Sequence, residues 1–353
     1  MTKEESIITK GMAILSMLFL HLFNRMGNVN LCENMLTIGE TPFVYILARA
    51  ANPVPFFIIL SGYGLYISHH KGTYNVLKKL CGLYLHYWIA LLIFVTLGFF
   101  IARDVYPGSV VDIINNVTAW NTTYNGEMWF LFPYGMIMLT SKWIVKVLDR
   151  FNPWLCLGVT FFLSLCTGYV ISRYGTQYLY GNQLLYKPVL YVQFLFPFTL
   201  GAYMAKYRER LFYDLWEKDK NLIGGGRNEG VECTRLKYQW LNKILPWLLL
   251  IALVVFRCCF ATGAFHVLYA AAFLFIFVKS PRPKIMNTCL LEMGKRSTSM
   301  WFVHSWFCYY LFHDWIYSFH YPLVIFSVLL ACSYASAVVI DLINVKIRVL
   351  LNL

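Results

Sequence analysis

The first long apolar stretch of the chain, residues 7–26, reads IITKGMAILSMLFLHLFNRM. A helix of about 20 apolar residues crosses the hydrocarbon core of a bilayer, which is about 30 Å thick. Lys10 and His21 interrupt the apolar run, and eleven residues at about 100° each bring both onto one helix face, about 16 Å apart along the axis. An ionisable group within a membrane span is costly. The sequence therefore predicts that this face lines the inside of a helix bundle and is functional.

The composition extends this interpretation to the whole chain. Of its 353 residues, 59% are hydrophobic and only 13% are charged, which is more apolar surface than a soluble domain can bury. Nine further apolar stretches follow, at residues 43–69, 80–102, 127–148, 153–172, 188–206, 244–260, 264–279, 298–317 and 321–343. The expected fold is all-α, a polytopic membrane helix bundle of about ten transmembrane helices in a single domain over residues 1–353. A turn at Ala261–Gly263 separates the seventh stretch from the eighth.

The basic residues predict the orientation of the bundle. With the N-terminus inside and an even number of spans, most of the 30 Lys and Arg residues fall on the inner side. This distribution is the positive-inside pattern, and it puts both termini in the cytoplasm. The net charge of +13 then has a membrane explanation. It does not need a nucleic-acid partner, which would require a basic face on a soluble domain.

Two loops and the cysteines complete the organisation. The range 207–243 contains the glycine-rich stretch 222–230 and is expected to form a mobile cytoplasmic loop. The range 103–126 is expected to form a long outer loop. Most of the ten cysteines lie in or beside apolar stretches, and none has the Cys or His spacing of a zinc site. Neither a disulfide framework nor a metal site is expected.

Several ionisable side chains are predicted to lie at one depth. Counted from the ends of their spans, His21, Arg49, Arg257 and Glu127 all fall in the outer half of the bilayer. We interpret this level as a water-containing cavity. The alternatives are snorkelling of each arginine towards the headgroups and a histidine bonded to a neighbouring carbonyl.

Two more side chains are placed by the same count. Trp129 falls at the outer level, where its ring is suited either to stacking on a sugar or to anchoring the helix at the interface. His304 is expected in the inner half, because it lies about two turns from the cytoplasmic end of its span. Trp129 and Arg257 are therefore candidate contacts for an outer substrate.

Five motifs in order give the chain a family resemblance. They are the Lys10-to-His21 pattern, FFIILSGY at 56–63, the basic and aromatic entry at 78–88, MWFL at 128–131, and Gly294-Lys295-Arg296-Ser297 followed by His304. The chain resembles the acyltransferase-3 family of integral-membrane O-acyltransferases almost from end to end. The family more often has Arg at the position of Lys10, and Arg and Pro near His86.

The resemblance implies transfer of an acyl group, usually acetyl, from cytoplasmic acyl-CoA to a hydroxyl of a cell-surface polysaccharide or lipid-linked glycan. It implies a bacterial cytoplasmic membrane and acetyl-CoA as co-substrate. The chain is similar to the stand-alone type, without a following SGNH domain. By position in the motifs, Ser61, Lys78, Lys79 and His304 are candidate contacts for the donor. The sequence leaves the acceptor, the acyl group and a homodimer open.

The chemical properties of the individual side chains also fit this reaction. Lys10, near the cytoplasmic end, is suited to a donor phosphate, and the pantetheine arm of acyl-CoA roughly matches the distance to His21. His21 is suited to act as a general base, although an acyl-histidine intermediate is also chemically allowed. Arg49 is the candidate for stabilising the oxyanion. Glu127 is expected either to orient His21 or to bind the acceptor.

Two other classes of function share some of these features. A glycolipid transporter or flippase would also place ionisable groups in a midplane cavity, but the sequence has no inverted repeat. A non-catalytic membrane sensor or scaffold would tolerate the loss of His21. Stabilisation of the protein by acetyl-CoA separates the enzyme from both.

Overall fold

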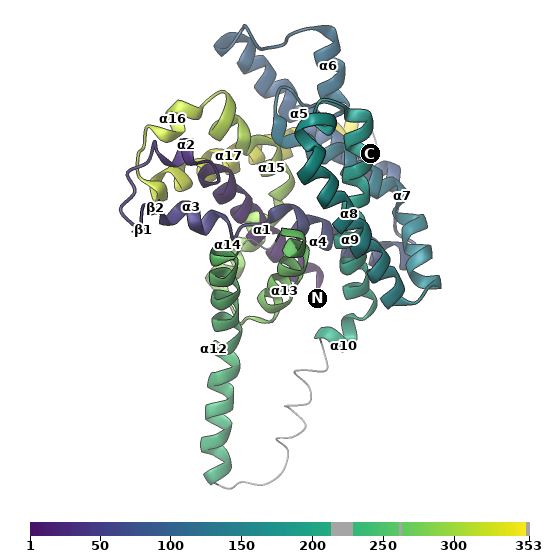
Figure 1. Cartoon of the computed structure of the whole chain (residues 1–353), viewed down its shortest axis with the longest axis vertical. Coiled ribbons are helices and arrows are strands. Elements are labelled where there is room, and N and C mark those ends of the chain that lie inside the picture. The colour runs from purple at the N-terminus through teal and green to yellow at the C-terminus, as the bar shows by residue number, and fades with distance from the viewer. Residues whose placement is uncertain (213–228, 261–262, 351–353) are drawn as a thin grey trace.

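The structure, a computed structural model, describes residues 1–212, 229–260 and 263–350 (Figure 1). Of residues 229–242 it describes the backbone only. Nearly all regular structure in this part of the chain is helical. The exception is a small hairpin of strands β1 (Thr37–Ile38) and β2 (Thr41–Pro42), in which Thr37 is opposite Pro42.

The helices divide into long spans and short connecting pieces. Four single turns have other helical forms: η1 (Gly126–Phe130) and η3 (Gly263–Phe265) are 3-10 turns, and η2 (Gly175–Leu179) and η4 (Trp306–Tyr310) are π turns. The α-helices are α1 (Lys3–Phe23), α2 (Met26–Val29), α3 (Phe43–Ala48), α4 (Pro53–His70), α5 (Val76–Ile101), α6 (Val110–Val117), α7 (Leu131–Arg150), α8 (Pro153–Tyr174), α9 (Gln183–Lys206), α10 (Arg208–Phe212), α12 (Glu229–Cys259), α13 (His266–Lys279), α14 (Lys284–Lys295), α15 (Ser297–Ser305), α16 (His313–Tyr317) and α17 (Pro322–Leu350).

The predicted all-α membrane bundle is confirmed. Within the described residues, 7 helical segments are long and apolar enough to cross a membrane: Lys3–Phe23, Phe43–His70, Val76–Ile101, Gly126–Arg150, Pro153–Leu179, Gln183–Lys206 and Pro322–Leu350. The other three predicted spans are helical as well. The stretch 244–260 is the end of α12, 264–279 is the shorter α13, and 298–317 is divided among α15, η4 and α16. Residues 261–262 of the predicted turn lie outside the described residues.

Both predicted loops contain helix. The range 207–243 includes α10 and the first part of α12, while residues 213–228 lie outside the described residues. The outer range 103–126 contains α6, whose N-terminus is closed by a capping box. The Ser109 hydroxyl accepts the N–H of Asp112, and the Asp112 carboxylate accepts the N–H of Ser109. A capping box satisfies backbone donors that a short helix otherwise leaves unpaired.

Long-range contacts follow the predicted two-sided arrangement. On the side assigned to the cytoplasm, the Arg282 guanidinium lies 2.5 Å from the Glu5 carboxylate. On the side assigned to the outside, the Glu33 N–H donates to the carbonyl of His320 at 2.9 Å. Each contact joins residues that the alternation of spans puts on one side. Which side faces the cytoplasm stays a prediction.

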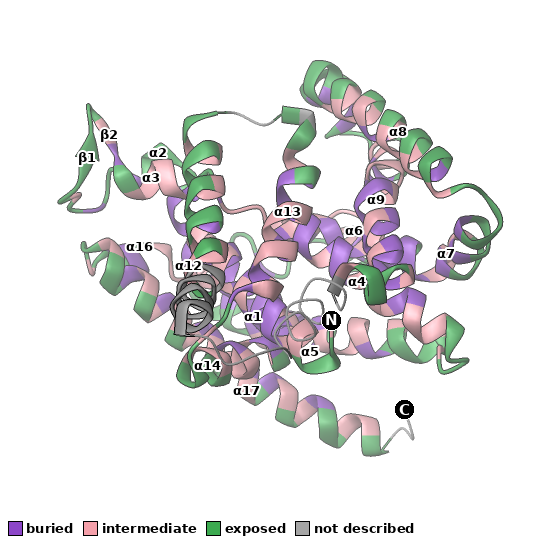
Figure 2. Cartoon of the chain, turned by 90° about the horizontal axis from the view of Figure 1, so that it is seen from below, coloured by how far each residue is buried: buried purple, intermediate pink, exposed green. Residues whose placement is uncertain are grey.

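Helix α1 lies in the middle of the bundle, where much of its surface is buried (Figure 2). It packs closely on α14 at two glycines. A Cβ atom on Gly11 would lie 1.9 Å from the carbonyl oxygen of Leu290, and one on Gly294 would lie 1.9 Å from that of Ile7. Small residues let helix backbones approach in this way inside membranes. The contacts run in opposite directions along the two helices, so α14 is antiparallel to α1.

Candidate functional site

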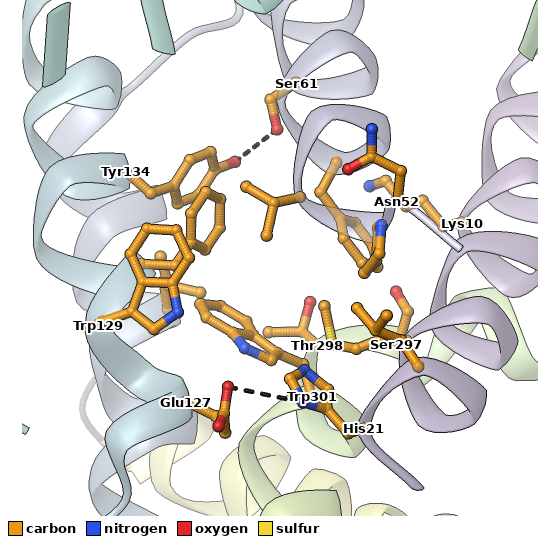
Figure 3. A pocket seen from close by; sticks show the side chains of 17 residues that line it. Lys10, His21, Asn52, Ser61, Glu127, Trp129, Tyr134, Ser297, Thr298 and Trp301 are labelled. Carbon is orange, nitrogen blue, oxygen red and sulfur yellow. Dashed lines mark hydrogen bonds and ion pairs between the residues drawn. The ribbon is translucent and has the colours of Figure 1, made fainter. Parts of the chain in front are cut away.

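One cavity of about 230 Å³ brings together residues from α1, α4, α7, α15 and η1 (Figure 3). Among the residues predicted from the sequence, Lys10, His21, Ser61, Glu127 and Trp129 line it. The other polar and aromatic side chains in its wall include Asn52, Tyr134, Ser297, Thr298 and Trp301. We call this cavity the central pocket. Leu83 of α5 lines it as well, so five separate segments of the chain contribute to one wall inside the bundle.

Helix α1 supplies the long axis of the central pocket. Its first turn is capped by the Thr2 hydroxyl, which accepts the N–H of Glu5 at 3.1 Å. Lys10, Met17 and His21 all line the pocket, and their spacings of seven and four residues put them on one helical face. Because α1 is regular from Lys3 to Phe23, Lys10 and His21 stand about 16 Å apart along it.

The hydrogen bonds of His21 determine its tautomer. Its Nδ1 lies 3.6 Å from Glu127 Oε2 and 3.2 Å from the Tyr309 hydroxyl. That hydroxyl donates its one proton to Asn24 Oδ1 at 3.0 Å, so towards His21 it can only accept. Nδ1 therefore carries the proton. The lone pair of His21 is left on Nε2, the nitrogen that a general base needs free.

Glu127 is held in place from both sides. Its carboxylate side chain is 15% exposed and lies 3.4 Å from the guanidinium of Arg25, which is itself 57% exposed. Arg25 also stacks on Tyr309, with its Cζ 4.1 Å from the ring centre. The backbone N–H of Glu127 donates to Asn125 Oδ1 at 3.3 Å. Glu127 is therefore fixed where it can orient the His21 ring.

The other end of the central pocket carries a cation without an acidic partner. In the part of the chain that the structure describes, no carboxylate forms an ion pair with Lys10. The hydroxyls of Ser297 and Thr298 belong to the same wall. The Ser61 hydroxyl is bonded to the Tyr134 hydroxyl at 2.8 Å (Figure 3). An ammonium without a carboxylate partner is suited to an anionic group such as a phosphate.

The structure does not bring the two predicted arginines into the central pocket. Arg49 is exposed at the end of α3, with its Cζ 5.3 Å from the centre of the Tyr45 ring. Arg257 lies near the end of α12, where its guanidinium donates to the carbonyl of Phe260 at 3.5 Å. Equal depth along a helix does not fix the direction of a side chain around it, and both arginines belong to other faces.

Lys78 and Lys79 also lie outside the central pocket. Both are exposed in the first turn of α5. The Lys79 ammonium donates to the Ser68 hydroxyl at 3.4 Å and lies 4.8 Å from the centre of the Tyr74 ring. Their places near the predicted cytoplasmic surface fit the general positive-inside bias.

His304 lies beside His21, so the predicted difference in depth between these two histidines was wrong. The two ring centres are 4.9 Å apart, and His304 is fully buried. The prediction counted depth from the apparent start of each span. The structure has a break at Arg296 between α14 and α15, and α15 starts at Ser297. His304 is only 6 positions after the predicted start of its span and His21 is 14 positions after its own, yet the rings are adjacent. The two spans therefore begin at different levels of the bundle.

Three residues of the site had little or no signal in the sequence. Arg25 lies just after the end of α1 at Phe23, four positions from His21 in the sequence, and its extended backbone directs it to Glu127 in a way that helical spacing does not predict. Tyr309 reaches His21 from the π turn η4, and Tyr134 reaches Ser61 from α7. Neither tyrosine could be chosen among the many aromatic residues of the chain without the fold.

A second polar cluster lies outside the lining of the central pocket and is fully paired. Asp341 of α17 lies 2.9 Å from the Arg296 guanidinium and 3.5 Å from His86 Nε2, and it accepts the Ser299 hydroxyl at 2.5 Å. The second nitrogen of His86, Nδ1, lies 2.8 Å from the carbonyl of Gly82. We call this set the Asp341 cluster.

Metal chemistry has no obvious ligand set. Across residues 1–212, 229–260 and 263–350, no three His, Cys, Asp or Glu side chains come together as metal ligands would. The described cysteines are free thiols. The groups available for chemistry in the central pocket are thus imidazole, carboxylate, ammonium and hydroxyl.

The chain was also compared with known protein families, and the result fits a pocket that contains a histidine and a carboxylate. A family profile described as an acyltransferase domain, that of acyltransferase-3, matches residues 5–342. The chain belongs to the acyltransferase-3 family. It is therefore a multi-pass membrane protein and an acyltransferase. No curated protein and no solved structure matches the chain.

Proposed function

We propose that this acyltransferase moves an acyl group, with acetyl expected, from cytoplasmic acyl-CoA to a sugar hydroxyl of a cell-surface polysaccharide or lipid-linked glycan. The observation that carries the proposal is that Lys10 and His21 line one pocket. A cation and a base about 16 Å apart on one helix suit a donor with a phosphate at one end and a thioester at the other. A bacterial cytoplasmic membrane is the expected location.

Lys10 would bind the phosphate-bearing part of the donor. A lysine ammonium is a compact charge that binds phosphate well. In a buried setting it needs a counter-charge, and the described part of the chain supplies no carboxylate to it. The pantetheine arm would then extend along α1 towards His21.

His21 would act as the general base. Its Nε2 takes the proton of the acceptor hydroxyl while the hydroxyl oxygen forms a bond to the thioester carbonyl carbon. The bond from this carbon to sulfur then breaks, and the thiolate of CoA leaves with the proton from Nε2. Glu127 lies on the Nδ1 side, where its negative charge stabilises the imidazolium and fixes the ring.

The oxyanion of the tetrahedral intermediate needs donors inside the pocket. Arg49 was the sequence candidate, and its exposed place outside the central pocket argues against this role. The Thr298 hydroxyl and the Trp301 indole N–H are donors in the pocket wall. We propose these two groups for the oxyanion.

The acceptor would enter from the outer side. Arg25 is exposed on the side assigned to the outside and pairs with Glu127, which supports a pocket that ends close to that surface beside His21. Trp129 offers a flat ring in the same wall for stacking on a sugar. The acyl group would thus cross much of the bilayer within the protein.

The experiment uses purified protein in sealed proteoliposomes of known orientation. Acetyl-CoA with a labelled acetyl group is confined to the cytoplasmic face, and envelope glycans are supplied on the opposite face. Base-labile label bound to the glycans is the expected product, and the His21→Ala variant should give none. Label that crosses without being attached would favour a transporter. Product formed only with donor and acceptor on the same side would overturn the trans-bilayer route.

A further inference from the structure

His304 is a buried polar side chain that the mechanism above does not use. It is fully buried, seven residues after Ser297 on α15. Its ring centre is 4.9 Å from that of His21, and the two planes are tilted by 44°. On the same helix Thr298 and Trp301 line the central pocket. His304 follows Trp301 by three residues, a spacing that brings two side chains to neighbouring positions on the helix surface.

The hydrogen bonds of His304 assign its tautomer as clearly as those of His21. Its Nδ1 lies 2.8 Å from the carbonyl oxygen of Trp301 and 3.3 Å from that of Met300. A carbonyl can only accept, so Nδ1 carries the proton. The lone pair is therefore on Nε2. This atom is buried and has no hydrogen-bond partner among the described residues.

A buried acceptor without a partner is unfavourable and rare in folded proteins, and it calls for an explanation. Here the neighbouring group is a second imidazole whose Nε2 also carries a lone pair. Two such acceptors cannot bond to each other while both rings are neutral. Once His21 Nε2 has taken a proton, it becomes a donor, and the pair can share that proton.

We propose that His304 Nε2 accepts a hydrogen bond from the protonated Nε2 of His21 during acyl transfer. The inference rests on the proposed function, in which His21 is the base. The proton comes from the acceptor hydroxyl, stays between the two rings while the carbon–oxygen bond forms, and leaves with the thiolate when the carbon–sulfur bond breaks. The hydrogen bond is absent in the resting enzyme. It therefore stabilises the transition state selectively, which is the condition for raising the rate rather than the affinity.

This role differs from the donor-binding role expected from the sequence. A contact to acyl-CoA acts on substrate affinity, and its loss raises KM with little change in kcat. A bond made only after proton transfer acts on kcat, and its loss leaves the affinity for acyl-CoA as it was. The two roles therefore give opposite results in a kinetic experiment.

Two substitutions separate catalysis from packing. His304→Leu keeps an apolar side chain of related volume, removes the unpaired acceptor and cannot bind a proton. His304→Gln keeps an acceptor oxygen near the position of Nε2. His266→Gln is a matched control, because its Nδ1 is bonded to a backbone carbonyl, that of Gly263, at 2.8 Å and it does not line the pocket.

The measurements are kcat, KM for acetyl-CoA, direct binding of acetyl-CoA and the midpoint of thermal unfolding. We expect kcat of His304→Leu to fall by roughly 10²-fold or more, with unchanged acetyl-CoA binding and an unchanged or raised midpoint. His304→Gln should keep at least ten times the rate of His304→Leu, and His266→Gln should match wild type.

Three results would overturn the inference. One is a His304→Leu enzyme with more than half of the wild-type kcat. Another is a raised KM for acetyl-CoA with unchanged kcat in either variant, which would make His304 a donor contact. The third, decisive if the leucine variant does not fold, is a folded His304→Gln no faster than His21→Ala. If the wild type itself transfers nothing, the proposed function fails first. If His21→Ala is inactive while His304→Leu is active, only the role of His304 fails.

Discussion

Two places in this molecule contain the same three kinds of side chain, a histidine, a carboxylate and an arginine. At the His21 end of the central pocket they are His21 and Glu127 in its wall and Arg25 beside it, with contacts of 3.6 Å and 3.4 Å. In the Asp341 cluster they are His86, Asp341 and Arg296, with contacts of 3.5 Å and 2.9 Å. Neither the types of residue nor the distances separate an active site from a structural ion-pair network.

The difference lies in what remains unpaired. Both nitrogens of His86 have partners, Asp341 for Nε2 and the carbonyl of Gly82 for Nδ1. His21 uses only Nδ1, and its ring lines a cavity. The central pocket therefore has room and a free lone pair, whereas the Asp341 cluster has neither. An unused lone pair beside a cavity is therefore the feature that distinguishes the candidate active site from the structural cluster.

The largest contrast is expected between the two histidines. His21→Ala should lower the rate of acyl transfer by roughly 10³-fold or more, because the base is lost. Its thermal stability and its binding of acetyl-CoA should stay close to wild type. The rate is measured with purified protein in proteoliposomes, and binding is measured by the thermal shift that acetyl-CoA produces.

His86→Ala is the matched control for that experiment. It should keep the rate within a few-fold of wild type, since the Asp341 cluster does not border the pocket. A His86 variant as inactive as the His21 variant would show that the two clusters are not functionally distinct. The unused lone pair of His21 would then not distinguish an active site from a structural cluster.

The next largest effect on the rate is expected at Glu127, the carboxylate of the central pocket. Glu127→Gln removes the charge that faces His21 Nδ1 while keeping the shape of the side chain. General acid–base catalysis by a positioned histidine contributes roughly 10²- to 10⁴-fold. Loss of the charge that orients His21 should remove part of this, so we expect kcat to fall by roughly 10- to 100-fold. A change in the KM of the acceptor alone would instead assign Glu127 to acceptor binding.

At the opposite end of the central pocket, Lys10 tests donor binding. Loss of one charge-assisted hydrogen bond costs about 1.5–3 kcal/mol, so Lys10→Ala should weaken acetyl-CoA binding by roughly 10- to 100-fold. Lys10→Arg should bind within a few-fold of wild type, because the cation is kept. Equal affinity in the alanine variant and the wild type would leave Lys10 with a role in orientation only.

The smallest effect on the rate is expected from Asp341→Asn. The substitution weakens bonds to Arg296, His86 and Ser299, and it should lower the free energy of unfolding by about 1–3 kcal/mol. The side chain is 24% exposed, which keeps the loss below that of a fully buried pair. Thermal unfolding measures this loss. A folded Asp341→Asn enzyme with a greatly reduced rate would contradict the structural role.

Periodicity accounts for the part of the site that the sequence predicts. The apolar runs indicate the spans, and a regular helix places Lys10 and His21 on one face whatever surrounds it. Glu127 and Trp129 were placed by their depth, and both line the central pocket. These residues were predictable because each depends on one helix and its distance from a membrane surface.

The residues that were misplaced depend on relations between helices. Arg49 and Arg257 have the expected depth count but point to other surroundings, because rotation about the helix axis is set by packing. His304 was misplaced because its span and that of His21 begin at different levels of the bundle, although the start of α15 at Ser297 agrees with the predicted one. Tyr309 belongs to the site only because η4 meets the end of α1. Such contacts join residues nearly 300 positions apart, and no local pattern encodes them.

The close contact of α1 with α14 has a consequence for how the protein is made. The glycine contacts join the first helix of the chain to one that begins at Lys284. A ribosome that adds about 5–20 residues per second reaches that helix roughly 10–50 seconds after it has completed α1. During this interval α1 is in or beside the membrane, and its ionisable face with Lys10 and His21 has no pocket to line, which is unfavourable within a span. The first helix to be synthesised therefore gains its closest packing partner only when one of the last helices is made. A chain that stops before Lys284 has Lys10 and His21 on α1 but lacks α14, against which α1 packs.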